Sequence, residues 1–162
     1  MSYQPEELEH NRKIKEGLCK EAEKLKASTE WREAAERFKA MQQEWRQTGP
    51  VPYADAELLN QRFRAACDTF FENRKRNYQA QELERIDNLY RKTELCEKAE
   101  ALKDSEDLQE ATEALQGFFE EWKSIGPVPR EKSDALWERF RAAQDAVYQR
   151  KRMLYEELDK SR

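Results

Sequence analysis

The tetrapeptide Gly49-Pro50-Val51-Pro52 recurs 77 residues later as Gly126-Pro127-Val128-Pro129. The same offset, applied without a gap, gives 24 identities in the 61 pairs between residues 18–78 and 95–155. Chance does not produce such agreement, so the chain contains two copies of one structural unit. We place the first helical repeat unit at residues 1–85 and the second at residues 86–162.

The tetrapeptide predicts the end of a helix, because glycine tolerates the left-handed conformation after the last turn and the following proline cannot continue the helix. We therefore expect a helix to end at Gly49 and another at Gly126, with positive φ at both glycines. Val51 and Val128, each between two prolines, should be extended and pack beneath the helices.

Apolar residues recur with helical spacing on both sides of this turn. Three helices per unit, each with one apolar stripe, can close a small core. The sequence therefore predicts an all-α fold of two tandem three-helix units, with Trp45 and Trp122 as core anchors just before each turn. The stripes are Trp31, Ala34, Ala35, Phe38, Met41 and Trp45, then Leu59, Phe63, Ala66 and Phe70; their copies are Leu108, Ala111, Leu115, Phe118 and Trp122, then Leu136, Phe140, Ala143 and Val147.

The segment from about residue 55 to residue 103 contains neither proline nor glycine. One continuous helix over it would be about 73 Å long. It would be the last helix of the first unit and the first of the second, and we predict this shared long central helix and an elongated molecule. A break near residues 73–77 or 87–88 is the alternative, because Asn and Asp are weak helix formers.

Composition narrows the class of protein. Charged residues make up 40% of the chain, yet 30 cationic and 34 anionic side chains nearly cancel, and the 4 Trp, 7 Phe and 6 Tyr indicate a packed core rather than disorder. A net charge of −4 argues against a general attraction to nucleic acid, while leaving room for a local basic strip.

No stretch approaches the ~20 apolar residues of a membrane span. Cys19, Cys67 and Cys96 are odd in number and widely spaced, which fits free thiols in the cytoplasm.

Catalytic chemistry finds no support in the residue pattern. His10 is the single histidine, and Glu7 gives it the Glu-x-x-His spacing of carboxylate-bridged metal sites, but the second copy has Asp87 in its place. A Ser–His–Asp or Cys–His arrangement would depend on this one histidine, and no phosphate-binding glycine loop occurs. We predict no enzyme activity, no metal, no cofactor and no small-molecule substrate.

Basic and aromatic residues share one face of the helix after each turn. We call these residues the basic-aromatic strip. Cations that neutralise phosphates and rings that stack on unpaired bases are typical of single-strand RNA binding. The alternatives are that the rings pack against the first helix while the arginines pair with its glutamates, or that the strip binds a protein. The strip comprises Arg64, Phe71, Lys75 and Tyr78 in the first copy and Arg141, Tyr148, Arg152 and Tyr155 in the second.

The segments 45–52 and 122–129 resemble the Trp-Lys-x-Ile-Gly-Pro-Val-Pro core of bacterial domain of unknown function 349, and residues 136–143 match that family's Leu-Trp-x-Arg-Phe-Arg pattern. The first copy departs from it with Asn60 in place of Trp137 and Thr48 in place of Ile125. The resemblance implies a helical, bacterial, intracellular protein, often arranged in longer tandem arrays, and it implies no activity.

The termini fall at nearly the same phase of the repeat, since Ser2 corresponds to Gln79 and Arg162 to Arg85. This favours a two-unit piece of a longer array over a natural two-unit protein with frayed ends. Our functional hypothesis is a non-enzymatic helical repeat scaffold that binds another macromolecule, with a protein as the expected partner. An RNA-binding module that uses the basic-aromatic strip is the alternative.

Overall fold

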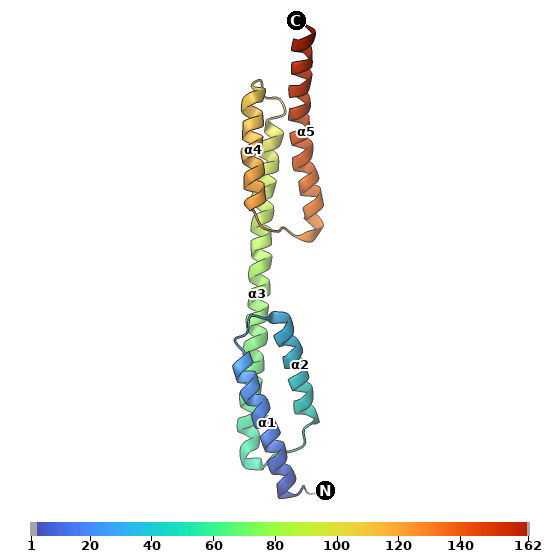
Figure 1. Cartoon of the computed structure of the whole chain (residues 1–162). Coiled ribbons are helices and arrows are strands. Elements are labelled where there is room, and N and C mark those ends of the chain that lie inside the picture. The colour runs from blue at the N-terminus through green and yellow to red at the C-terminus, as the bar shows by residue number, and fades with distance from the viewer. Residues whose placement is uncertain (1–2, 162) are drawn as a thin grey trace. The chain divides into compact units, whose positions relative to one another are not determined.

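A computed structural model describes residues 3–161, and that part of the chain forms five α-helices and no strand (Figure 1). The prediction of an all-α fold is confirmed. The helices are α1 (Pro5–Leu25), α2 (Trp31–Gln47), α3 (Tyr53–Ala101), α4 (Leu108–Ser124) and α5 (Arg130–Lys160). The chain divides into two compact units, Met1–Gln79 and Ala80–Arg162, which we call unit 1 and unit 2.

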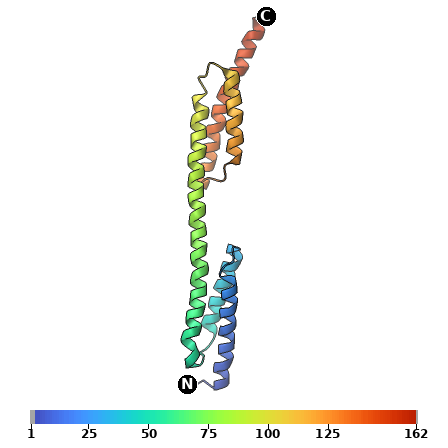
Figure 2. The same ribbon diagram turned by 90° about the vertical axis from the view of Figure 1, so that its left-hand side faces the viewer.

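Unit 1 is a three-helix bundle of α1, α2 and the first part of α3 (Figures 1 and 2). Phe38 and Phe70 stack at 4.6 Å in its centre and are fully buried. Trp45 lies flat on Phe63, with ring centroids 4.4 Å apart, and so covers the end of the core beside the turn. The buried residues are Leu18, Cys19, Ala22, Ala34, Ala35, Phe38, Met41, Leu59, Phe63, Ala66, Cys67 and Phe70.

Unit 2 repeats this bundle with the last part of α3, α4 and α5 (Figures 1 and 2). Trp122 stacks on Phe140 at 4.8 Å, as Trp45 does on Phe63. Val128 is buried and Val51 packs against its own core, so both valines lie beneath the bundle as expected. The buried residues are Leu95, Cys96, Ala99, Leu108, Ala111, Leu115, Trp122, Ile125, Val128, Leu136, Phe140, Ala143 and Val147.

Helix α3 runs without interruption for 49 residues, which confirms the long continuous helix. The expected alternatives, a break at residues 73–77 or 87–88, do not occur. Its apolar stripe is interrupted instead, because residues 78–81 are exposed and Leu83 and Ile86 also face solvent. Backbone hydrogen bonds and good helix formers therefore hold this section with little help from packing.

The turn after α2 and α4 differs from its prediction. Helix α2 ends at Gln47 and α4 at Ser124, and the next residues, Thr48 and Ile125, are extended with ψ of 134°. No residue between 3 and 161 has a positive φ, so the predicted left-handed conformation of Gly49 and Gly126 is wrong.

Glycine is required at the turn for a different reason, which is the close approach of an asparagine side chain. The Asn88 side-chain amide donates a hydrogen bond of 2.8 Å to the carbonyl of Pro127. A Cβ atom added to Gly126 would lie 3.0 Å from that amide nitrogen, and one added to Gly49 would lie 2.8 Å from the Asn11 amide nitrogen. A side chain at either position would force the asparagine away from the turn.

Candidate functional site

The basic-aromatic strip of unit 2 lies on α5 and is only partly free. Arg141 and Arg152 are exposed, and the Tyr155 ring is 52% exposed. Tyr148 is half-buried because it packs against the core of unit 2. The Arg141 guanidinium lies 4.0 Å from the Asp145 carboxylate, and Arg152 donates a 2.8 Å hydrogen bond to the neutral Gln149 amide.

The strip of unit 1 lies on the first part of α3 and has the same character. Arg64 and Lys75 are exposed, and Tyr78 is 63% exposed. Phe71 is half-buried and meets Phe38 edge to face at 5.9 Å. In each unit the central ring of the strip is therefore a structural residue, and one ring with two cations remains on the surface.

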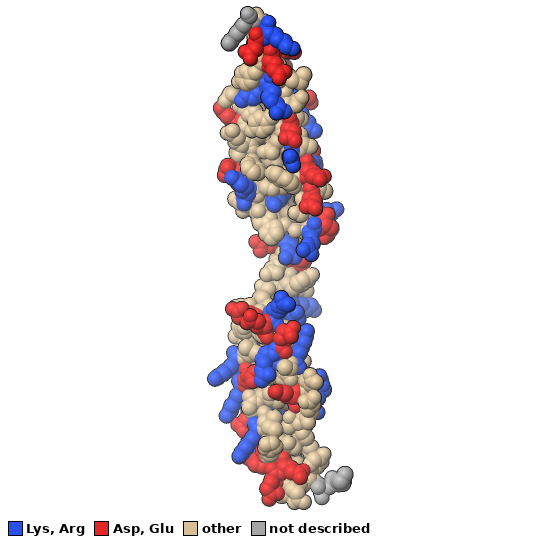
Figure 3. Space-filling model, turned by 45° about the vertical axis from the view of Figure 1, so that its right-hand side comes forward, with Lys and Arg blue, Asp and Glu red and all other residues tan. Residues whose placement is uncertain are grey.

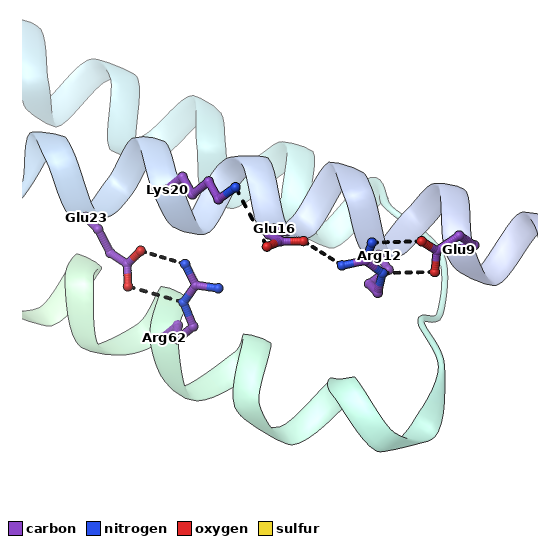
Figure 4. A network of polar contacts seen from close by, with 6 residues as sticks. All are labelled: Glu9, Arg12, Glu16, Lys20, Glu23 and Arg62. Atoms are coloured by element: carbon purple, nitrogen blue, oxygen red, sulfur yellow. Dashed lines mark hydrogen bonds and ion pairs between the residues drawn. The ribbon is translucent and has the colours of Figure 1, made fainter.

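Arginines on the inner side of the same helices are paired with the first helix of each unit. Arg62 donates two hydrogen bonds to Glu23 on α1, the shorter of 2.7 Å (Figure 4). Arg139 donates two to Glu100 on α3, of 2.9 and 2.7 Å. These bonds lower the pKa values of both carboxyl groups. Pairing with first-helix glutamates was one alternative for the cations near the strip, and it applies to these two.

Two further cations near the strip are bound by neighbouring polar groups, Arg150 by the α3–α4 connection and Lys151 by the first turns of α4. The Arg150 guanidinium donates to the carbonyls of Lys103 and Ser105, the latter at 2.9 Å. The Lys151 ammonium donates to Gln109 and Thr112 on α4 and lies 5.9 Å from the Tyr155 ring centroid. Glu106 and Asp107 line the shallow hollow beside Tyr155, so this end of the strip carries negative charge as well.

The surface as a whole carries both signs of charge. On the face drawn in Figure 3, acidic and basic side chains are intermixed over each unit. On α1, alternating charges form a chain of ion pairs from Glu9 through Arg12 and Glu16 to Lys20 (Figure 4). These pairs neutralise Arg12 and Lys20 locally, so the positive charge along α1 is interrupted by carboxylates.

An aromatic group lies at the surface of unit 2 around Trp137, a residue that was not among the predicted site residues. Trp137 on α5 lies 6.0 Å from Phe119, 5.8 Å from Trp122 and 6.3 Å from Phe140, measured between ring centroids. We call these four residues the aromatic cluster. Trp122 and Phe140 are buried, whereas the Trp137 side chain is 37% exposed. The signal in the sequence was the replacement of Trp137 by Asn60 in the first copy.

Contacts between the first helix and the turn are duplicated, and sequence reasoning missed them. The Asn11 and Asn88 amides each donate a 2.8 Å hydrogen bond to the first proline carbonyl of the turn. One turn further along the helix, Lys15 and Lys92 lie 4.8 and 4.9 Å from the Trp45 and Trp122 rings. The offset of 77 relates these pairs, although they lie outside the segment in which the identities were counted.

The cysteines and the histidine lie in places that do not form a reactive site. Cys19, Cys67 and Cys96 are buried free thiols, and burial raises the pKa of Cys19 to about 11. The Cys19 thiol donates to the Leu59 carbonyl at 3.4 Å, and Cys96 to that of Leu136 at 3.5 Å. His10 is exposed on α1. Among residues 3–161, no three His, Cys, Asp or Glu side chains gather so that they could hold a metal ion.

The turn and the two bundles can be compared with known proteins. The family model Domain of Unknown Function (DUF349) matches residues 3–54 and 58–131. The chain belongs to the DUF349 family. Both matched segments end shortly after the Gly-Pro-Val-Pro turn, at positions 77 residues apart, as two copies of the DUF349 domain require. Neither the comparison with curated proteins nor that with solved structures gave a match.

In the described part of this DUF349 protein, every helix is too short or too polar to cross a membrane.

Proposed function

We propose that this DUF349 protein is a non-enzymatic, cytoplasmic scaffold that binds another protein through the outer faces of its third helices. The observation that carries the proposal is the placement of the basic-aromatic strip. Exposed tyrosine and arginine or lysine side chains lie on α3 and α5, beside the faces of these helices that fill the two cores. Tyrosine and arginine are the residue types enriched at the centres of protein interfaces.

A protein partner fits these surfaces better than a single-stranded nucleic acid. Stacking of successive bases needs open ring faces, and Phe71 and Tyr148 pack against the cores. The nearby Arg62 and Arg139 are paired with carboxylates, which lowers the positive potential that a phosphate backbone would meet. The absence of enzyme activity is proposed because the thiols are buried and His10, the single histidine, is exposed to solvent and well separated along α1 from Cys19.

RNA binding is the second candidate, and one observation favours it. Arg64, Lys75 and Tyr78 of unit 1 are all exposed on one face, so a short contact with one base and two phosphates is sterically open. The affinity of such a contact would fall steeply with salt. In a plot of the logarithm of the binding constant against the logarithm of the salt concentration, each neutralised phosphate adds about one unit to the slope.

The experiment that tests the proposal is capture of partners from a bacterial lysate by the tagged full chain, with and without ribonuclease. A protein partner should persist after ribonuclease treatment and should bind less well when Arg141 and Arg152 are both changed to glutamate. The matched control is the Arg130→Glu, Lys132→Glu variant, which reverses the same number of exposed charges on α5 away from the strip. Loss of every captured protein on ribonuclease treatment would favour the RNA alternative.

A further inference from the structure

In unit 2 the basic-aromatic strip continues into the aromatic cluster. Trp137, Arg141, Tyr148, Arg152 and Tyr155 follow a spacing of i, i+4, i+11, i+15 and i+18, which places them on one face of α5. The face spans about 27 Å at 1.5 Å per residue. It begins with a tryptophan that is 37% exposed and ends with a tyrosine that is 52% exposed.

Trp137 has the properties of a rigid anchor for a partner. Its ring is held on three sides by Phe119, Trp122 and Phe140, so little side-chain freedom remains to be lost on binding. A large, partly open ring on a well-packed base is the usual form of an interface hot spot. The partner must offer an apolar or aromatic side chain to cover the open part of this ring.

The anchor belongs to unit 2 alone. Asn60 and Gln42 occupy the positions of Trp137 and Phe119 in unit 1, and Asn60 is exposed. The rest of the strip is similar in the two units, with Arg64, Lys75 and Tyr78 matching Arg141, Arg152 and Tyr155. Unit 1 therefore provides an internal control for the anchor.

The charges along this face indicate that the partner's binding segment is negatively charged. Arg141 has only a long contact of 4.0 Å with Asp145, and Arg152 is bound to a neutral amide. Lys123, the α4 cation over the Phe119 ring, is paired with Glu120 at 2.9 Å. The two arginines therefore offer guanidinium groups that can receive carboxylates in the bidentate geometry. Glu106, Asp107 and Lys151 line the hollow beside Tyr155, so this end of the face carries both signs of charge, and a polypeptide can present a neutral residue there.

We propose that the α5 face of unit 2 binds an acidic polypeptide segment that places an aromatic or large apolar side chain on Trp137 and carboxylates on Arg141 and Arg152. This inference rests on the proposed protein-binding function and adds the site and the chemistry of the partner. Unit 1 binds such a segment more weakly because Asn60 offers no anchor.

The test uses the full chain and a fluorescent random copolymer of glutamate and tyrosine, with binding followed by anisotropy. Trp137→Asn should weaken binding by about tenfold or more, and Trp137→Phe should retain most of it. Asn60→Ala, the matched change in unit 1, should have no effect, and Asn60→Trp should strengthen binding. Arg141→Glu with Arg152→Glu should reduce binding to the weaker level that unit 1 provides. The Trp137→Phe and Asn60→Trp variants keep the test decisive if Trp137→Asn fails to fold.

Three results would overturn the inference: unchanged affinity in Trp137→Asn, equal binding of a lysine–tyrosine copolymer, or tighter binding of polyuridylate that competes with the acidic copolymer. If a lysate protein resists ribonuclease and binds wild type and Trp137→Asn equally, the scaffold function stands and this site is wrong. If no protein is captured without RNA, the scaffold function itself fails.

Discussion

Gly126 and Asn88 form a close contact at the turn of unit 2, and a double-mutant cycle of the two residues can test how this contact affects stability. Gly126→Ala should destabilise the protein, because the new Cβ would lie 3.0 Å from the Asn88 amide nitrogen. Asn88→Ala should cost about 1–2 kcal/mol, since Asn88 is buried and its loss leaves the Pro127 carbonyl without its hydrogen bond. In urea unfolding, the added cost of Gly126→Ala should fall when Asn88 is already alanine.

Equal costs of Gly126→Ala in the two backgrounds would contradict the contact. Gly117→Ala is the matched control, because a Cβ there meets no atom within 4 Å and glycine is a poor helix former. That change on α4 should leave stability unchanged or raise it.

Trp45 and Trp122 cover equivalent ends of the two cores with unequal burial. Trp122 is 8% exposed and stacks on Phe140, whereas Trp45 is half-buried on Phe63. Trp122→Ala should therefore cost roughly 3–5 kcal/mol, and Trp45→Ala less. Thermal unfolding of both variants measures the difference. A larger loss of stability in Trp45→Ala than in Trp122→Ala would contradict the inference that the more deeply buried tryptophan contributes more.

The Glu100–Arg139 pair makes a pH-dependent contribution to stability. Hydrogen bonds from Arg139 lower the pKa of Glu100 below its ordinary 4.5. A carboxyl group with a lowered pKa stabilises the fold above its unfolded pKa and loses this effect as pH falls through the folded pKa. Wild type should exceed Glu100→Gln by about 0.5–1 kcal/mol at pH 7, and the difference should shrink below pH 4.5. A difference that persists at pH 3 would contradict the ionic origin. Glu84→Gln, at an exposed site of the same helix, should change little.

At the residue scale, the sequence predicted which side chains are buried better than how the turn is built. The apolar stripes and the positions of Val51 and Val128 followed from period and proline chemistry. The conformation of Gly49 and Gly126 did not, because the Asn11 and Asn88 side chains that require glycine lie 38 residues away on the first helix. Only their shared offset of 77 could have pointed to them.

At the element scale, α3 carries the sharpest expectation about dynamics. Residues 79–87 of this helix lie between the segments packed into the two cores, and most of them are exposed. Their amides should exchange with solvent faster than those around Phe63 or Phe140, because opening there breaks few apolar contacts. Segment-resolved hydrogen exchange measures this directly. Protection of residues 79–87 equal to that around Phe63 would contradict the description of this section as weakly supported.

The ends of α2 and α4 were predictable from the Gly-Pro-Val-Pro turns, and the continuity of α3 from the absence of proline and glycine within it. The exposure of the basic-aromatic strip could not be predicted. Tyr78 and Phe71 lie on the same face of the helix, and their spacing does not tell which ring is exposed and which is packed against the core. Phe71 reaches back to Phe38 on α2, a contact that depends on how α2 and α3 pack in three dimensions.

At the scale of the whole molecule, each of the two units closes a hydrophobic core of its own. Each has its own core, its own tryptophan over the turn and its own glutamate–arginine pair. The offset of 77 made this duplication evident from the sequence, and the family match repeats it. The surface difference between the units, Trp137 against Asn60, is the feature on which the proposed difference in binding depends.

Hydrogen exchange of the full-length Phe140→Ala variant tests most directly whether each unit is stabilised by its own core. Phe140 is fully buried in unit 2, and its truncation should cost about 3–5 kcal/mol within that unit. We expect α4, α5 and the last part of α3 to lose protection, while α1, α2 and the amides around Phe63 keep theirs. Equal loss of protection in both units would contradict this expectation.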